Sequence, residues 1–372
     1  MTISYDQIFD FQNLHRAYIG AKKHKQYRDS ILKFGYKLEE NLIKLRQELS
    51  DKTYKHGGYR EFTVNDSKKR TIKAAPFRDR VAHHALCNII EPVMEREFIY
   101  DSYACRKGKG THSAIKRLEK FIRSLKSRAQ NDGKDRYQIY CLQCDISKYF
   151  DSINHDVLIK LLERKIKDEN ILQLCREIIA SNKKACPPSL CSGVSWRGIP
   201  IGNLTSQLFA NVYLNELDNF VKRKLKERYY IRYMDDFLIL GLDKKHLCDD
   251  KEYIRVFLRD QLKLELHPKK AEIFPIGFFG KLPVSNRKNR GVDFLGYVVR
   301  DGKRYLRRST IKRFLKKSRR YAVMFKNGQV SKQSILNAYS SWRGYFKFAD
   351  AYNLIKKIVA DDIFISCAWY QY

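Results

Sequence analysis

The chain has 372 residues, of which 44% are hydrophobic and 31% charged, enough to build more than one hydrophobic core. Its 74 Lys and Arg residues outnumber its 41 Asp and Glu residues, so the net charge is 74 − 41 = +33. This excess argues against an ordinary metabolic enzyme and favours nucleic acid as the partner. No stretch approaches the roughly 20 apolar residues of a membrane span, so we expect no membrane partner. The N-terminus lacks the pattern of a signal peptide, and the cysteines do not have the pattern of a disulfide framework in a short secreted protein. We therefore expect a cytoplasmic protein.

The first half of the chain alternates between helical and β patterns. Residues 1–56 carry apolar side chains three or four positions apart, which predicts helices that end at Gly57-Gly58. These positions are Phe34, Leu38, Leu42, Leu45 and Leu49. Apolar and polar residues alternate over 59–75, which predicts a β-hairpin with its turn at Asn65-Asp66, and residues 78–98 are helical again.

The next part of the chain predicts a mixed α/β body. A polar insert at 126–135 leads into a β-rich run at 137–146, and residues 181–200 form a loop rich in Pro, Gly and Ser. A helix is expected from Asn203 onward. Residues 229–240 then read as two strands around a turn at Met234-Asp235.

The composition changes at about residue 300. Residues 300–326 contain twelve Lys or Arg residues against one acid, and their apolar positions have a helical spacing. The chain is therefore expected to be an α+β protein whose mixed body is followed by a basic helical lobe that contacts a phosphate backbone.

Three acidic residues stand at the ends of predicted strands. Asp145 ends the run QIYCLQCDI, and Asp235 and Asp236 lie in the turn between two apolar runs. If these strand ends are neighbours, three carboxylates crowd one place, and a hard cation such as Mg²⁺ relieves their repulsion. The alternative is that Asp235-Asp236 is simply a turn pair.

Several motifs together resemble the reverse transcriptase family. YMDD at 233–236, with DISKYFDSIN upstream of it, is similar to the catalytic motifs of these enzymes. KKRTIKAAPFRDRVAHHALCNIIEP and SYACRKGKGTHSAI resemble blocks of bacterial reverse transcriptases related to group II introns. NRGVDFLGYVVR and SSWRGYFKFADAYNLI resemble the blocks that follow, so the likeness runs in order from about residue 60 to 355.

This resemblance implies a right-hand polymerase, with fingers, a palm built on an antiparallel sheet and a helical thumb. The implied parts are an N-terminal helical extension at 1–56, fingers at 57–115, a palm at 116–299 that includes the loop 181–200, and a basic thumb at 300–372. The implied activity is RNA-directed DNA synthesis by two-metal nucleotidyl transfer, in a protein encoded by a bacterium or phage.

The resemblance also implies roles for individual residues. The catalytic residues are Asp145, Asp235 and Asp236, which together with Ile146 hold two Mg²⁺ ions or, as a substitute, Mn²⁺. The residues assigned to nucleotide binding are Lys68, Arg70, Arg78, Phe150, Ile201, Gly202, Gln207 and Lys270. Those assigned to nucleic-acid binding are Arg307, Arg308, Lys312, Arg313, Lys316 and Lys317.

Chemistry supports some of these assignments and leaves others open. Arg70 suits a triphosphate because a guanidinium grips phosphate oxygens at two points. Phe150 stands where the family has an aromatic gate against a 2′-hydroxyl, although a core phenylalanine is the plainer interpretation. Either Lys269 or Lys270 matches a lysine that protonates pyrophosphate.

The block IGNLTSQ at 201–207 indicates a subfamily. Most reverse transcriptases begin this block with Gln-Gly and end it with Ser-Pro, whereas here Ile201 comes first and Gln207 last. That departure is typical of diversity-generating retroelements. An isoleucine offers no hydrogen bond beside the incoming nucleotide, which predicts error-prone copying, chiefly at template adenines. The alternative is that Ile201 is only an apolar filler at a strand end.

The subfamily implies a set of partners. These are a template-repeat RNA and its complementary DNA duplex, deoxynucleoside triphosphates, and a small basic accessory protein that forms an oligomer. The copied DNA would diversify a target gene. Two other hypotheses remain from the sequence: a retron-like or defence-associated reverse transcriptase, and a non-catalytic RNA-binding scaffold.

Overall fold

The computed structural model describes residues 3–65, 69–132, 136–182, 184–185, 196–280, 290–300, 302–352, 354 and 356. The chain divides into two compact units. The first comprises Met1–Cys105, Cys144–Phe237 and Asp249–Ala271, and the second Arg106–Gln143, Leu238–Cys248 and Glu272–Tyr372. Among the described residues, no helix has the length and hydropathy needed to span a membrane.

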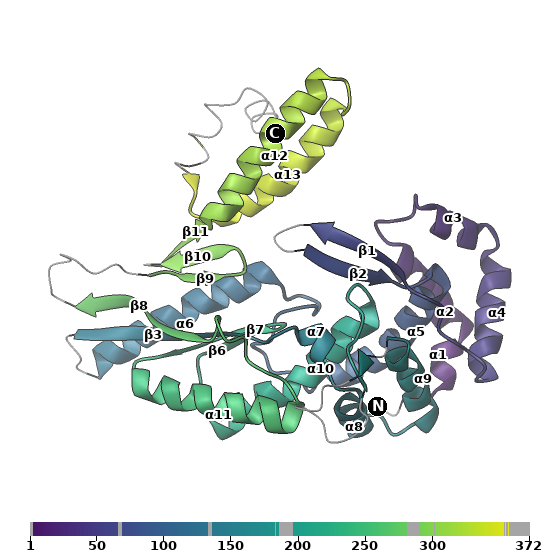
Figure 1. The fold of residues 1–372 in the computed structure, drawn as a ribbon, viewed down its shortest axis with the longest axis horizontal. Helices are drawn as coiled ribbons and strands as arrows, with labels where there is room; N and C mark the ends of the chain where they lie inside the picture. The colour runs from purple at the N-terminus through teal and green to yellow at the C-terminus, as the bar shows by residue number, and fades with distance from the viewer. Residues whose placement is uncertain are drawn as a thin grey trace. The chain divides into compact units, whose positions relative to one another are not determined.

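Four helices form the N-terminal part of the first unit (Figure 1). They are α1 (Asp6–Phe9), α2 (Phe11–Lys22), α3 (Asp29–Tyr36) and α4 (Leu38–Ser50). Leu42, Leu45 and Leu49 are buried along one face of α4, as their spacing predicts. The helices end at Ser50, earlier than the predicted Gly57-Gly58. The core they enclose includes α5 (Phe77–Glu95), against which α2 packs.

The predicted hairpin is present between these helices and α5 in the sequence. Strands β1 (Arg60–Asn65) and β2 (Lys69–Ala74) pair antiparallel, with Val64 opposite Arg70. Of the predicted turn at Asn65-Asp66, Asp66 lies outside the described residues.

Helix α6 (Thr111–Asn131) corrects one prediction. Residues 126–131 of the expected polar insert are helical, because Leu125 and Ala129 continue the buried face begun by Leu118 and Ile122. The polar residues between them are good helix formers on the exposed side, so polarity there does not signal a loop.

The central sheet has four strands in the order β6-β7-β3-β8. Its members are β3 (Arg136–Asp145), β6 (Tyr230–Tyr233), β7 (Asp236–Gly241) and β8 (Glu272–Gly280). The predicted strands at 137–146 and 229–240 are thus confirmed. β8 pairs antiparallel with β3, with an irregularity in register between Ile139 and Tyr140.

Helices and a short strand pair connect these strands. The helices are α7 (Tyr149–Ser152), α8 (His155–Glu163), α9 (Glu169–Ala180), α10 (Leu204–Asn219) and α11 (Lys244–Leu262). The ends of the predicted loop 181–200 pair as β4 (Lys184–Ala185) and β5 (Trp196–Arg197). The helix expected from Asn203 is α10, and it continues as a π-helical turn, η1 (Phe220–Lys224).

The C-terminal part of the second unit begins with strands. β9 (Val292–Phe294), β10 (Tyr297–Arg300) and β11 (Lys303–Leu306) form an antiparallel sheet, and α12 (Arg308–Lys326) and α13 (Lys332–Phe348) follow. The helix expected over 300–326 therefore starts only at Arg308. Charge does not distinguish an exposed strand from a helix, and apolar side chains with helical spacing begin only in α12.

Aromatic rings join the last two helices, which lie side by side in Figure 1. The Phe314 ring of α12 lies with its centroid 5.1 Å from that of Trp342 and 5.0 Å from that of Phe346, both on α13. The fold class is α+β with antiparallel sheets, as predicted.

A buried histidine makes the stability of the first unit depend on pH. His83 is 1% exposed, and its ring stacks on that of His56 with the two centroids 5.2 Å apart. Neither ring nitrogen of His83 has a hydrogen-bond partner among the described residues. Burial lowers the pKa of His83 to about 3, with smaller contributions from His56, His84 and Arg80.

We predict that acidification destabilises the protein through His83. In the unfolded chain this histidine binds a proton near pH 6.5, and in the folded chain it does not. The contribution of neutral His83 to the free energy of unfolding is therefore fully present above pH 6.5 and is lost as the pH falls toward 3. From pH 7.5 to 5 this group should cost about 2 kcal/mol in the free energy of unfolding. His83→Phe should remove that part of the pH dependence in denaturant titrations, whereas the exposed His15→Gln should follow the wild type. An unchanged pH slope in His83→Phe would contradict this account.

Candidate active site

The ends of strands β3 and β6 meet through a backbone hydrogen bond. Asp145 is the last residue of β3, Asp235 lies in the turn after β6, and Asp236 begins β7. The N–H of Ile146, directly after Asp145, donates to the carbonyl of Asp235 at 3.2 Å. The predicted proximity of these strand ends is therefore confirmed, and it brings acids from distant parts of the sequence together.

A third segment holds the end of β3 from another side. The Asp145 carbonyl accepts a hydrogen bond from the His267 N–H at 2.7 Å, and the Ser147 N–H donates to the Glu265 carbonyl at 2.8 Å. Ile146 and Leu266 form an antiparallel bridge between these contacts. The backbone on both sides of Ile146, directly after Asp145, is thus fixed by residues 265–267.

This segment also brings a lysine to the Asp145 carboxylate. Lys270 Nζ forms an ion pair with Asp145 Oδ2, and the side chains are 38% and 18% exposed. The Lys269 backbone N–H instead donates to His267 Nδ1 at 3.2 Å. Of the two lysines that the sequence left open, Lys270 is therefore the one that contacts Asp145.

The donor set fits a divalent metal ion. Asp145, Asp235 and Asp236 carry carboxylate oxygens, which are the hard ligands that Mg²⁺ takes, and the Ile146 N–H joins the two strand ends by donating to the Asp235 carbonyl. One of these carboxylates already faces a cationic group, Lys270 Nζ. The arrangement therefore favours positive charge at this position.

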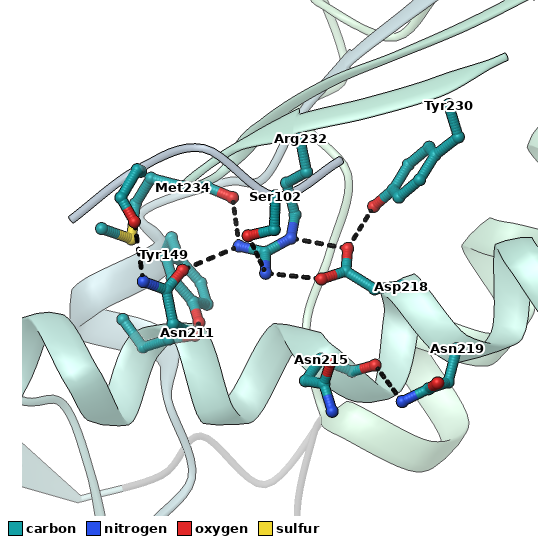
Figure 2. Close-up of polar contacts among 11 residues, drawn as sticks. Ser102, Tyr149, Asn211, Asn215, Asp218, Asn219, Tyr230, Arg232 and Met234 are labelled. Carbon is teal, nitrogen blue, oxygen red and sulfur yellow. Dashed lines mark hydrogen bonds and ion pairs between the residues drawn. The ribbon is translucent and has the colours of Figure 1, made fainter. Parts of the chain in front are cut away.

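Beneath the turn lies a buried polar network that sequence reasoning missed (Figure 2). Arg232 and Asp218 are both fully buried and form a bidentate ion pair, with Nε–Oδ1 at 2.7 Å and Nη2–Oδ2 at 2.6 Å. The signal was an arginine within the apolar strand YYIRY, because a buried charge requires a buried partner. The sequence could not show that the partner is Asp218 on α10.

Several predicted nucleotide-binding residues lie on one loop beside β2. The Lys73 N–H donates to the Ile201 carbonyl at 3.1 Å, and the Asn203 side-chain amide donates to the Lys73 carbonyl at 3.4 Å. Gly202 has φ +120°, and a Cβ there would lie 2.8 Å from Ile72 Cγ2. Gln207 follows in the first turns of α10.

Phe150 is half-buried on the short helix α7 next to Asp145 in sequence. Its carbonyl accepts a hydrogen bond from the Ile199 N–H at 2.8 Å, and its ring lies 5.5 Å from that of Tyr149. The loop that carries Ile201 is therefore anchored on α7 as well as on β2.

The predicted basic residues of the hairpin region have different surroundings. Arg70 is exposed on β2. Arg78 is committed to the protein itself: it forms ion pairs with Glu48 and Asp79, the latter at 2.9 Å, and its guanidinium lies over the Tyr54 ring at 4.8 Å. Lys68 lies outside the described residues.

Most of the predicted nucleic-acid-binding residues lie on the exposed side of α12. These are Arg308, Lys312, Arg313, Lys316 and Lys317. Arg307, just before the helix, is half-buried, and its Nε donates to Asp293 Oδ1 at 2.7 Å. The Arg307 guanidinium therefore already has an acidic partner within the protein.

Comparison with known proteins identifies the family of this chain. The family model for reverse transcriptases (RNA-dependent DNA polymerases) matches residues 55–299, and the chain belongs to this family. The α+β fold is accordingly that of a right-hand polymerase, as predicted.

Relatives of this chain occur in bacteria and fungi. It is 26% identical over 274 residues to Protein YkfC of Escherichia coli (65% of this chain and 66% of that protein). It is also 26% identical over 341 residues to the group II intron-encoded protein LtrA of Lactococcus lactis (74% and 51%). Among solved structures, a telomerase from Candida albicans in complex with an RNA fragment has a TM-score of 0.46 and 14% identity, over 68% of this chain and 45% of that one. The chain thus spans about half to two thirds of these curated relatives.

We predict that Gly202→Ala destabilises the protein and disturbs the loop. The added Cβ meets Ile72, and φ +120° strains any residue other than glycine, so the free energy of unfolding should fall by about 1–3 kcal/mol. The matched control is Gly58→Ala, where a Cβ meets nothing within 4 Å. Chemical denaturation of both variants measures the difference, and equal stabilities would contradict the close packing at Gly202.

Proposed function

We propose that this chain is an RNA-directed DNA polymerase that works by two-metal nucleotidyl transfer. The observation that carries the proposal is the hydrogen bond between Ile146 and Asp235, because it joins the two strand ends that carry the acids. Membership of the reverse transcriptase family supports the same reaction. The +33 net charge suits an RNA template and its DNA copy as substrates.

The acids have distinct roles in this proposal. Asp145 and Asp235 would hold both ions, with the Ile146 carbonyl as a further ligand, and Asp236 would support the ion on the primer side. When bound, Mg²⁺ or Mn²⁺ would make the primer 3′-hydroxyl a better nucleophile and stabilise charge on the leaving pyrophosphate. The chain's own contribution is to hold the three carboxylates in place through the backbone contacts of residues 146 and 265–267.

Other residues would handle the triphosphate. Lys270 Nζ, beside Asp145, carries a proton that it can give to a pyrophosphate oxygen as that group leaves. Arg70, which is exposed on β2, would grip the phosphates, with Lys68 nearby in sequence. Phe150 would contact the deoxyribose and disfavour a 2′-hydroxyl. Arg78 would act indirectly, because its guanidinium holds α4 and α5 together through Glu48 and Asp79.

We assign the parts of the polymerase as the sequence predicted them. The fingers would span 57–115, the palm 116–299 and the thumb 300–372, with an N-terminal extension at 1–56. The exposed basic side of α12 would follow the duplex backbone and respond to charge rather than to base sequence.

We further propose that the enzyme belongs to a diversity-generating retroelement and copies adenines inaccurately. The support is Ile201, whose side chain can make no hydrogen bond, on a loop fixed to β2 through the Lys73 N–H. A site without a hydrogen-bonding group penalises wrong geometries less. The template would be a template-repeat RNA, and a small basic accessory protein would be a partner. Near-identical repeats beside the gene, differing mainly at adenines, would be the expected genomic context.

The first prediction from the proposed function tests the polymerase activity itself. Asp235→Ala should reduce primer extension on an RNA template by at least ~10³-fold, because a metal ligand supplies several kcal/mol of transition-state stabilisation. Asp260→Ala, an exposed acid paired with Arg259, is the matched control and should remain active. If both variants extend primers like the wild type, the acids are not catalytic and an RNA-binding scaffold becomes the better description.

The second prediction tests fidelity. Ile201→Gln should lower misincorporation opposite template adenines by ~10-fold, because a hydrogen-bonding amide penalises wrong pairs by about 1 kcal/mol or more. Ile201→Leu keeps the position apolar and should copy as inaccurately as the wild type. Sequencing of the products from a defined RNA template measures both. The same error rate in both variants would remove Ile201 as the cause.

A further inference from the structure

We propose that Arg232 is a positioning residue for the catalytic turn: its guanidinium holds the carbonyl of Met234 and so sets the direction of the Asp235 carboxylate. This inference rests on the proposed polymerase function. It concerns a residue that would touch neither substrate nor metal.

The turn that carries the acids has an unfavourable backbone conformation. Met234, between β6 and β7, has φ 56°, in the left-handed region that residues with a side chain seldom adopt. Such a conformation persists only where surrounding contacts determine it. A contact that stabilises the backbone conformation of Met234 should therefore lie near this residue.

Arg232 supplies that contact from two residues earlier. Its Nη1 donates to the Met234 carbonyl at 3.1 Å and to Asn211 Oδ1 at 3.3 Å. Asn211 is itself anchored, because its side-chain amide donates to the Ala104 carbonyl at 2.9 Å. Figure 2 shows the guanidinium between these acceptors.

Asp218 fixes the guanidinium in this orientation. Two parallel hydrogen bonds, at 2.7 and 2.6 Å, match the planar fork of arginine to the carboxylate. Tyr230 donates its hydroxyl proton to Asp218 Oδ1 at 2.7 Å, and Ser102 Oγ accepts from Arg232 Nη2 at 3.1 Å. Burial by itself would lower the pKa of Arg232, but the Asp218 carboxylate outweighs burial and raises it, so the arginine stays charged.

The backbone of Arg232 is held as firmly as its side chain. Its N–H donates to the Asp101 carbonyl at 3.0 Å, and its carbonyl accepts from the Tyr103 N–H at 3.0 Å. Residues 101–104 thus lie along β6 and fix the strand that leads into the turn. Two stretches distant in sequence, 101–104 and α10, thus converge on this one arginine of β6 (Figure 2).

Both peptide planes beside Asp235 are therefore pinned. The Met234 carbonyl, in the plane before Asp235, accepts from Arg232, and the Asp235 carbonyl, in the plane after it, accepts from Ile146. Because each peptide unit is planar, two fixed planes determine φ and ψ of the residue between them, and with them the direction of its Cα–Cβ bond. The Asp235 side chain is thus aimed before any metal binds.

The principal test is Arg232→Lys. Lysine keeps the charge but lacks the fork, so it cannot hold Asp218 and Met234 at once. We expect kcat to fall ~10–100-fold, because a displacement of about 1 Å at reacting groups has this effect. The KM for nucleotide and the Kd for primer–template should stay within about threefold of the wild type. The matched control is Tyr230→Phe, which removes one hydrogen bond to Asp218 and leaves the Met234 contact; its kcat should change by less than about threefold.

Two further measurements separate positioning from lost stability. Mn²⁺ binding, followed by calorimetry without nucleotide, should weaken in Arg232→Lys and not in Tyr230→Phe. Met234→Gly allows the left-handed φ without strain, so Arg232→Lys should reduce kcat less in the Met234→Gly background than in the wild type. If Arg232→Lys does not fold, Ser102→Ala, which removes one acceptor of the fork, should lower kcat ~3-fold at unchanged KM.

The outcomes distinguish the two proposals. Wild-type kcat and Mn²⁺ affinity in folded Arg232→Lys, or a Tyr230→Phe variant that loses as much of both, would overturn the role of Arg232 and leave the polymerase standing. A wild-type protein that extends no primer would overturn the polymerase. The Mn²⁺ comparison would then still decide whether Arg232 orients the carboxylates.

Discussion

The hydrogen bond between the Ile146 N–H and the Asp235 carbonyl is the contact on which the site depends. It joins two strand ends that are far apart in the sequence and that both carry acids. Lys270 gives one of these acids, Asp145, a cationic partner, and in the proposed polymerase a divalent ion would be a further one. In the proposed polymerase, a group of acids that is unfavourable by itself would become useful when cations and phosphates bind.

Buried and exposed charges serve different purposes in this chain. Exposed pairs such as Arg255–Glu252 contribute little to stability, because water screens them. The Arg232–Asp218 pair is fully buried, where desolvation offsets much of the attraction between the charges. Its value is geometric, because the guanidinium fork allows few orientations and bonds both Asp218 on α10 and the Met234 carbonyl in the turn between β6 and β7.

The basic residues of α12 show how part of the excess positive charge is arranged. On α12, Phe314 packs against aromatic residues of α13, while the neighbouring Lys and Arg side chains remain exposed. One helix therefore has an aromatic face that holds it to the protein and a cationic face available to a phosphate backbone. Other predicted binding residues, namely Arg78, Lys270 and Arg307, instead pair with acids of the protein itself.

The sequence by itself determined the hairpin at 59–75, the strands that end in Asp145 and Tyr233, and the basic surface of the last helices, because local periodicity and turn residues encode such features. It misjudged residues 126–131 and 300–307, where polarity alone does not identify the element. Only the tertiary structure decided which lysine meets Asp145, and that a buried Asp218 on α10 holds Arg232 beneath the turn. These pairings depend on how distant segments pack, and no spacing along the chain records that.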